Sequence, residues 1–300
     1  MLNIIKRYKL WFIVSAIISG VCIVALAVFG LKFGIDFQGG TLTQMRFEQN
    51  LPGNPEIREH LVSDGFLGVT VQSAEEKSVI VRTPPMEKEE HDRLLKSISD
   101  KFGTVSEEQF TSIGPVIGRE LKQNAIWQLL LVSLGIVLYI AYAFRKVSKP
   151  VSSWKFGVAA IVALVHDLLI VIGIFAILGR FLDVEIDSLF VTALLTVLGF
   201  SVHDTIVVFD RIRENLRTHG AYDLSEIIND SINQTLVRSI NTSLTVIFVL
   251  LALLLFGGET IRYFVLALLI GITAGTYSSI FIASPLLYVW HRWDERNRSV

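Results

Sequence analysis

The sequence predicts an α-helical membrane protein with six transmembrane helices and one α+β ferredoxin-like domain between the first and second helices. Hydrophobic residues make up 52% of the 300 residues and charged residues only 18%, whereas a typical soluble domain is about 25% charged. The mean hydropathy of +0.55 agrees with this. Charged residues gather in residues 32–124, and the rest of the chain consists mainly of long apolar runs.

Six segments are long enough to cross a bilayer, which takes roughly 20 mainly apolar residues. The first could be a signal peptide, because it has a basic start and a small-residue site at Ala25-Leu26-Ala27. Its apolar run of about 22 residues is longer than a usual signal-peptide core, so we expect an uncleaved span. The predicted spans are Leu10–Leu31, Ala125–Phe144, Phe156–Leu178, Leu189–Phe209, Leu236–Phe256 and Phe264–Trp290.

Basic residues in the short loops predict the orientation, because Lys and Arg are enriched on the cytoplasmic side. Opposite loops carry only Arg180 and Arg262 beside several acidic residues. We therefore expect a multi-pass protein with both termini in the cytoplasm, made of residues 1–31 (N-terminus and first helix), 32–118 (the extracytoplasmic or periplasmic α+β domain) and 119–300 (a five-helix bundle with a cytoplasmic C-terminus). The basic ends on one side contain Lys6, Arg7, Lys9, Arg145, Lys146, Lys149, Lys155, Arg211, Arg213, Arg217, Arg292, Arg296 and Arg298.

The segment between the first two spans alternates strand and helix patterns. Its order, β-α-β-β-α-β, is the split arrangement of ferredoxin-like folds. An exposed edge of such a sheet could accept an extended peptide by strand addition. We expect His60 and His91 to be solvated surface residues. The predicted strands are Leu42–Phe47, Val69–Gln72, Ser78–Thr83 and Ser106–Ser112, and the predicted helices are Pro55–Asp64 and Glu87–Phe102.

Several function classes are disfavoured by composition and motifs. The net charge of -1 argues against a nucleic-acid partner, because phosphate binding needs a basic excess. The single cysteine, Cys22, cannot form an intramolecular disulfide and is expected to be an apolar filler. The chain has no H-E-x-x-H metal motif, and Ser201 and His203 are poorly spaced on one helix for nucleophilic catalysis. We expect neither an enzyme nor a metal site.

Asp204 and Arg238 are the foremost candidate site residues. A carboxylate near the bilayer centre costs at least roughly 2.5–3.5 kcal/mol, so such a residue usually marks a function. Both residues are expected at similar depth in consecutive antiparallel spans. Burial favours the protonated carboxyl and a nearby guanidinium favours the ionised form, so Asp204 could take up and release a proton. The alternative is a static ion pair that locks helix packing.

His166 and Asp167 form a second candidate site in the third span, roughly ten residues deep. Both proton transport and structural hydrogen bonding stay open for them. Asp210 and Arg211 are expected to form a charged pair at the membrane interface.

The sixth span carries small and hydroxyl residues that predict close helix packing. Gly271 and Gly275 have small-xxx-small spacing, and Thr276, Ser278 and Ser279 follow. Such a run allows close helix approach and hydrogen bonds between helices.

Four short strings together resemble SecF of the SecD/SecF family, membrane subunits of the bacterial protein-export machinery. They are GIDFQGG at 34–40 after the first span, IGPVIG at 113–118 before the second, VHDTIVVFDRIREN at 202–215 closing the fourth, and NQTLVRS at 233–239 opening the fifth. Each string alone is a modest signal, but their order is highly specific, and the resemblance covers essentially the whole chain.

The resemblance implies a role in protein translocation by the Sec pathway in the bacterial cytoplasmic (inner) membrane. It implies a SecD partner of the same plan, a SecYEG channel, an unfolded secretory preprotein as substrate, and a likeness to half-transporters of the resistance-nodulation-division superfamily. The proton-motive force would drive the process, with the proton as coupling ion and no other cofactor. The rival functions are a proton-coupled efflux-type half-transporter and a non-transporting scaffold of the translocase.

The resemblance also assigns roles to residues. Asp204 and Arg238 match the family's proton-transport positions, while His203 occupies a position often filled by Asn in relatives. His203 is a secondary candidate for proton transport, as are His166 and Asp167 from their depth in the third span. The motif residues Gly34, Asp36, Gly39 and Gly40 mark the start of the outside domain, where Gly39-Gly40 permits a turn that a Cβ would strain.

Overall fold

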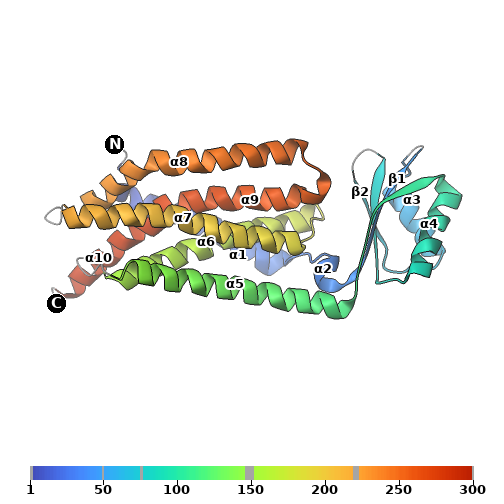
Figure 1. Ribbon diagram of the computed structural model, residues 1–300, viewed down its shortest axis with the longest axis horizontal. Coiled ribbons are helices and arrows are strands. Elements are labelled where there is room, and N and C mark those ends of the chain that lie inside the picture. The colour runs from blue at the N-terminus through green and yellow to red at the C-terminus, as the bar shows by residue number, and fades with distance from the viewer. Residues whose placement is uncertain (1–2, 49–50, 75–76, 146–151, 219–222, 299–300) are drawn as a thin grey trace. The chain divides into compact units, whose positions relative to one another are not determined.

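The computed structural model describes residues 3–48, 51–74, 77–145, 152–218 and 223–298 and divides into two compact units (Figure 1). The membrane unit comprises residues 1–32, 127–184 and 189–300. The second unit, which we call the β-domain, comprises residues 33–126 together with the short segment 185–188. The sequence placed the end of this domain at residue 118 and did not anticipate that a distant loop belongs to it.

Among the described residues, six helices are long and apolar enough to cross a membrane, which confirms the predicted plan of one span before the β-domain and five after it. The last span is continuous through a π-helical turn, η2, where the Ser284 hydroxyl donates to the Ser279 carbonyl at 2.9 Å. The spans are α1 (Tyr8–Phe29), α5 (Pro115–Ala143), α6 (Ser153–Phe181), α7 (Ser188–Thr218), α8 (Leu224–Phe256), and α9 (Glu259–Ser278) followed by η2 (Ser279–Ala283) and α10 (Ser284–Arg298); the short turn η1 (Ile5–Arg7) precedes α1.

Several helices extend well beyond the predicted apolar runs. Helix α5 begins ten residues before the predicted Ala125, and α8 begins at Leu224 rather than Leu236. Asp223 caps α8, because its side chain accepts a hydrogen bond from the Ser225 backbone N–H at 3.3 Å. Hydropathy therefore marks the membrane-embedded part of a helix, whereas capping residues mark where the helix begins.

Small residues bring α9 close to α7, as predicted. A Cβ at Gly271 would overlap the Val197 side chain, and a Cβ at Gly275 would lie 2.9 Å from the Ser201 Cβ. In a second close contact, Gly173 of α6 packs against Cys22 of α1. Only residues without a side chain allow helix backbones to approach this closely.

The β-domain has the predicted ferredoxin-like order. Its four strands form one antiparallel sheet in the order β2-β3-β1-β4. Met45, Phe47, Ile57, Leu94 and Ile98 belong to its core, which joins one face of the sheet to both helices. The elements are α2 (Ile35–Gln38), β1 (Gly40–Phe47), α3 (Asn54–Ser63), β2 (Thr70–Ser73), β3 (Ser78–Thr83), α4 (Lys88–Phe102) and β4 (Val105–Ile113).

Two expectations for the β-domain are wrong. His91 is buried at 5% exposure and its ring lies 4.1 Å from that of Phe110. It shares the apolar face of α4 with Leu94 and Ile98, three and seven residues further along. His60 is half-buried, with its Nε2 3.0 Å from the Ser97 hydroxyl.

The predicted orientation rests partly on Lys146 and Lys149, which lie outside the described residues.

Candidate functional site

Asp204 lies on α7 in the interior of the membrane unit and is only 5% exposed. Its Oδ2 accepts hydrogen bonds from the Ser243 hydroxyl of α8 and the Thr276 hydroxyl of α9, each at 3.3 Å. The two hydroxyl oxygens are themselves 2.6 Å apart. The carboxyl group therefore meets two other spans through long hydrogen bonds.

The surroundings of Asp204 accept either protonation state. The Thr276 hydroxyl also lies 3.0 Å from the Ile272 carbonyl oxygen. Since a hydroxyl both donates and accepts, Thr276 and Ser243 can donate to an ionised carboxylate. When Asp204 is protonated, Thr276 can turn its proton to the Ile272 carbonyl and accept from the acid. In both states Oδ2 of Asp204 and the two hydroxyls keep a hydrogen-bond partner.

Arg238 does not pair with Asp204 in the part of the chain that the structure describes, so the expected contact is absent. Arg238 is exposed on α8, and Ser243 is the α8 residue that reaches Asp204. They are five positions apart in the chain, which corresponds to about 140° around the helix and about 7.5 Å along it. The guanidinium group therefore lies on a different face of α8.

Asp167 is fully buried on α6 and has three hydrogen-bond partners. Its Oδ2 accepts from the Ser201 hydroxyl of α7 at 2.6 Å and the Ser278 hydroxyl of α9 at 2.7 Å. Its Oδ1 lies 3.0 Å from Nδ1 of His166. This cluster, which we call the Asp167 clasp, ties three spans together and engages the serine once considered as a nucleophile.

His166 is 7% exposed, and its Nε2 has no hydrogen-bond partner among the described residues. Its ring stacks on that of Tyr277, with centroids 6.2 Å apart. The Tyr277 hydroxyl in turn lies 3.0 Å from the Ser15 hydroxyl of α1. The imidazole thus extends the clasp toward α1.

The hydroxyl residues of the sixth span make the predicted bonds between helices. Ser279 completes the set, with its hydroxyl 2.8 Å from that of Thr205 on α7. The prediction of an Asp210–Arg211 pair is wrong: Asp210 pairs with Arg213, and Arg211 with Glu214 at 2.6 Å. Residues three apart share a helix face, whereas adjacent residues do not.

The glycine motif forms the turn that the sequence predicts. Gly39 and Gly40 have φ values of +78° and +147°. A Cβ at Gly39 would lie 2.9 Å from Cα of Pro115. Backbone at such φ values favours glycine, so the turn also sets how closely the start of α5 can approach.

The motif also holds the segment 185–188, a contact that sequence reasoning missed. The Gly34 N–H donates to the Ile186 carbonyl at 2.8 Å, and Oδ2 of Asp36 accepts from the Ser188 N–H at 2.8 Å. Arg82 of β3 forms an ion pair with Glu185 at 3.0 Å. The only signal in the sequence is the acidic composition of this short loop.

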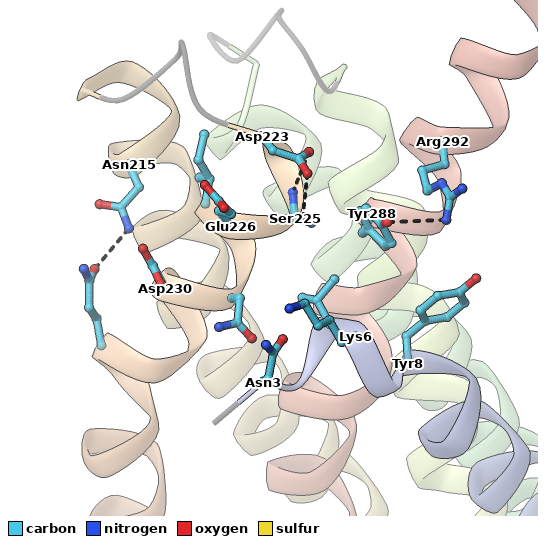
Figure 2. A pocket seen from close by; sticks show the side chains of 14 residues that line it. Asn3, Lys6, Tyr8, Asn215, Asp223, Ser225, Glu226, Asp230, Tyr288 and Arg292 are labelled. Carbon is cyan, nitrogen blue, oxygen red and sulfur yellow. Dashed lines mark hydrogen bonds between the residues drawn. The ribbon is translucent and has the colours of Figure 1, made fainter. Parts of the chain in front are cut away.

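A separate cavity of about 860 Å³ lies between η1, α7, α8 and α10 (Figure 2). Asp204, Arg238 and Asp167 are not among its lining residues. Its polar walls include Lys6, Asp223, Glu226, Asp230 and Arg292. The cavity is therefore distinct from the two buried carboxyl sites.

Comparison with family models identifies the relationship. Residues 94–293 match the model described as protein export membrane protein SecD/SecF, C-terminal, and residues 24–50 match the SecD/SecF GG motif. The chain belongs to the SecD/SecF family. It is a multi-pass membrane protein.

Individual relatives agree with this assignment. A protein translocase subunit SecF of Thermobaculum terrenum is 50% identical, covering 98% of this chain and 95% of the relative. A SecF of Anaerolinea thermophila is 40% identical, covering 99% and 96%. A protein translocase subunit SecDF of Thermus thermophilus is 40% identical over 87% of this chain and 35% of the relative.

A solved structure agrees as well. The crystal structure of SecDF, a translocon-associated membrane protein from Thermus thermophilus, matches with a TM-score of 0.84 and 35% identity. The match covers 97% of this chain and 39% of that chain. This chain therefore spans about two fifths of the solved SecDF chain.

Proposed function

We propose that this chain acts as a SecF subunit of a protein translocase and takes up protons at Asp204 to promote the export of unfolded preproteins. The observation that carries the proposal is the buried Asp204 carboxyl, whose hydroxyl partners from α8 and α9 accept both protonation states. The proposed location is the bacterial cytoplasmic membrane, with both termini inside and the β-domain outside. The translocase names of the relatives support the substrate class.

The proton-motive force is large enough for this role. One charge that crosses 100 mV releases about 2.3 kcal/mol. That energy biases a two-state equilibrium roughly fifty-fold. Protonation of Asp204 removes a charge and changes the direction in which Thr276 donates. Because Ser243 and Thr276 belong to α8 and α9, this change would shift the relative stability of two arrangements of these helices around α7.

SecD is the proposed partner, and it would cover the polar residues that this chain exposes in its spans. Thr196 and His203 are exposed on α7, and Arg238, Asn241 and Thr245 on α8. Polar groups that face hydrocarbon are expensive, and they are usually found against protein or water. The fusion named SecDF supports this partner. SecYEG would be a further partner, as the channel through which the preprotein moves.

Arg238 belongs to the proton path in this proposal, although it does not contact Asp204. Its exposed position suits a contact with SecD or with water between the subunits, from which protons would reach Asp204. His203, a secondary candidate for proton transport from the sequence, is exposed on α7, which supports a position on the same proposed interface.

His166 and Asp167 are proposed as a structural centre that fixes α6, α7 and α9. The three short hydrogen bonds of Asp167 support this role. One observation favours a second role, as an additional proton-binding site on the path. The buried Nε2 of His166 has no partner among the described residues, and such a group suits a bound water or an exchanging proton.

The substitution Asp204→Asn tests the proposal in vesicles that contain the chain with SecD and SecYEG. Under an imposed proton gradient, we expect the gradient-dependent part of preprotein export to be lost, because Asn cannot take up a proton. Protein level and SecD binding should stay normal. Asp210→Asn, at an exposed position on the same helix, is the control and should export normally.

Other outcomes distinguish the rival functions. Normal gradient-dependent export by the Asp204→Asn variant would contradict proton coupling at Asp204. It would favour the rival function of a non-transporting scaffold of the translocase. An efflux-type half-transporter would instead lose proton-coupled movement of small molecules while preprotein export stays unchanged.

A further inference from the structure

The second half of the connection between α6 and α7 belongs to the β-domain. Residues 185–188, the last of which begins α7, cluster with residues 33–126, whereas residues 182–184 and the flanking parts of α6 and α7 belong to the membrane unit. Phe33 and Ile186 form a parallel β-bridge, and the Gly34 N–H donates to the Ile186 carbonyl. The first residue of α7 is thus held by the domain that precedes α5 in the chain.

Two charged side chains of the β-domain, Arg82 and Asp36, bind this segment. Arg82 pairs with Glu185 at 3.0 Å, and the two side chains are only 19% and 15% exposed. Oδ2 of Asp36 accepts from the Ser188 N–H, the first backbone donor of α7. A helix leaves its first N–H groups without partners inside the helix. A carboxylate near this end also interacts favourably with the helix dipole.

The Arg82 pair is built into the sheet. Arg82 lies opposite Leu42 in β1 and opposite Thr70 in β2. Its partner Glu185 has a second contact, with Gly34. A Cβ added to Gly34 would lie 3.5 Å from Oε2 of Glu185. The neighbouring backbone thus positions both ends of the pair, which links the sheet to the segment 185–188.

We propose that Asp36 and the Arg82–Glu185 pair form a joint through which a change at Asp204 is transmitted to the β-domain. Asp204 lies sixteen residues after Ser188 on one continuous helix, about 24 Å along its axis. A rigid helix carries a displacement over that length to its first residue. The route thus bypasses α1 and α5, the connections that the chain order alone suggests. This inference rests on the proposed proton function of Asp204.

The test uses the full chain with SecD and SecYEG in vesicles and measures two quantities. One is proton uptake, read by a pH-sensitive dye in the vesicle lumen, and the other is gradient-dependent preprotein export. In Arg82→Glu we expect proton uptake near the wild-type rate and export reduced about fivefold or more. Asp36→Ala should likewise keep proton uptake near the wild-type rate while export falls. The double variant Arg82→Glu/Glu185→Arg should restore export.

Arg46→Glu is the matched control. It makes the same substitution in the same sheet, at an exposed residue whose 3.4 Å pair with Glu108 does not involve the loop. We expect it to export normally.

Three results would overturn the joint: wild-type export by Arg82→Glu, a parallel loss of proton uptake and export, or a double variant that assembles without regaining export. If Arg82→Glu alone fails to assemble with SecD, export by the double variant Arg82→Glu/Glu185→Arg decides whether the joint exists. Failure of the joint can be distinguished from failure of the proposed function. If the proton function of Asp204 holds, Asp204→Asn loses both proton uptake and gradient-dependent export, whatever the Arg82 variants show.

Discussion

The membrane unit contains two buried carboxyl groups that differ in how tightly they are held. Asp167 is completely buried, and the hydroxyls of Ser201 and Ser278 donate to it at 2.6 and 2.7 Å. Asp204 retains 5% exposure, and its two hydroxyl partners lie at 3.3 Å. Both groups receive hydroxyls from α9, and the Asp204 carboxyl also receives one from α8, that of Ser243.

The difference indicates a division of labour. Short hydrogen bonds from two other helices and an adjacent imidazole favour one fixed arrangement around Asp167. The longer bonds from the Ser243 and Thr276 hydroxyls favour exchange at Asp204. Stability should therefore depend most on Asp167, and proton coupling most on Asp204. The following substitutions test this division, from the largest expected effect to the smallest.

Removal of the Asp167 side chain should cause the largest loss of stability. In Asp167→Ala, the Ser201 and Ser278 hydroxyls lose a buried acceptor, Nδ1 of His166 loses its hydrogen-bond partner, and a cavity remains. We expect the free energy of unfolding in detergent to fall by about 3–5 kcal/mol, because each buried polar group left unpaired costs about 1–3 kcal/mol.

Asp167→Asn is the matched variant, because the amide keeps the volume and one acceptor oxygen. It should cost about 1–2 kcal/mol and retain gradient-dependent export. Loss of export in Asp167→Asn at wild-type stability would make Asp167 a proton carrier and end the division of labour.

The next largest effect is expected when the close packing of α9 against α7 is disturbed. This packing positions the hydroxyls of α9 at both carboxyl groups. Gly271→Ala would force the added Cβ into Val197. Overpacking of this kind costs about 1–3 kcal/mol, which thermal unfolding of the purified protein can measure. Gly135→Ala on α5, where the added Cβ has no neighbour within 4 Å, should change stability by less than about 0.5 kcal/mol. Equal effects at the two glycines would contradict the close packing.

These features differ in how far sequence could predict them. The six spans and the β-α-β-β-α-β order follow from hydrophobic patterns, which local physics determines. Asp167 and Asp204 were conspicuous because carboxylates are rare in apolar runs. The face on which Arg238 lies was not predictable, because it depends on the rotation of α8 about its axis. The same holds for the Arg82–Glu185 pair, whose partners lie 103 positions apart in the chain.

The smallest effect is expected at Thr276, one of the two donors to Asp204. Thr276→Val keeps the shape but removes a hydroxyl that lies 3.3 Å from the carboxylate. Both protonation states of Asp204 lose this partner, but the ionised form loses more, because hydrogen bonds to a charged group are the stronger ones. The protonated form is then favoured, and proton release becomes harder. A hydrogen bond of this kind contributes about 0.5–1.5 kcal/mol. We therefore expect export at a limiting proton gradient to fall by about threefold, with the full rate recovered at a larger gradient.

Thr273→Val is the control for this measurement. Thr273 lies on the same helix but is exposed, and its hydroxyl donates to the Leu269 carbonyl of its own helix at 2.7 Å. Export should be unchanged in this variant across the whole range of gradients. If Thr276→Val instead abolished export as completely as Asp204→Asn, Asp204 would depend on a single hydroxyl. Ser243 would then be unable to replace Thr276, and the weakly held exchange site inferred from the two long bonds would be wrong.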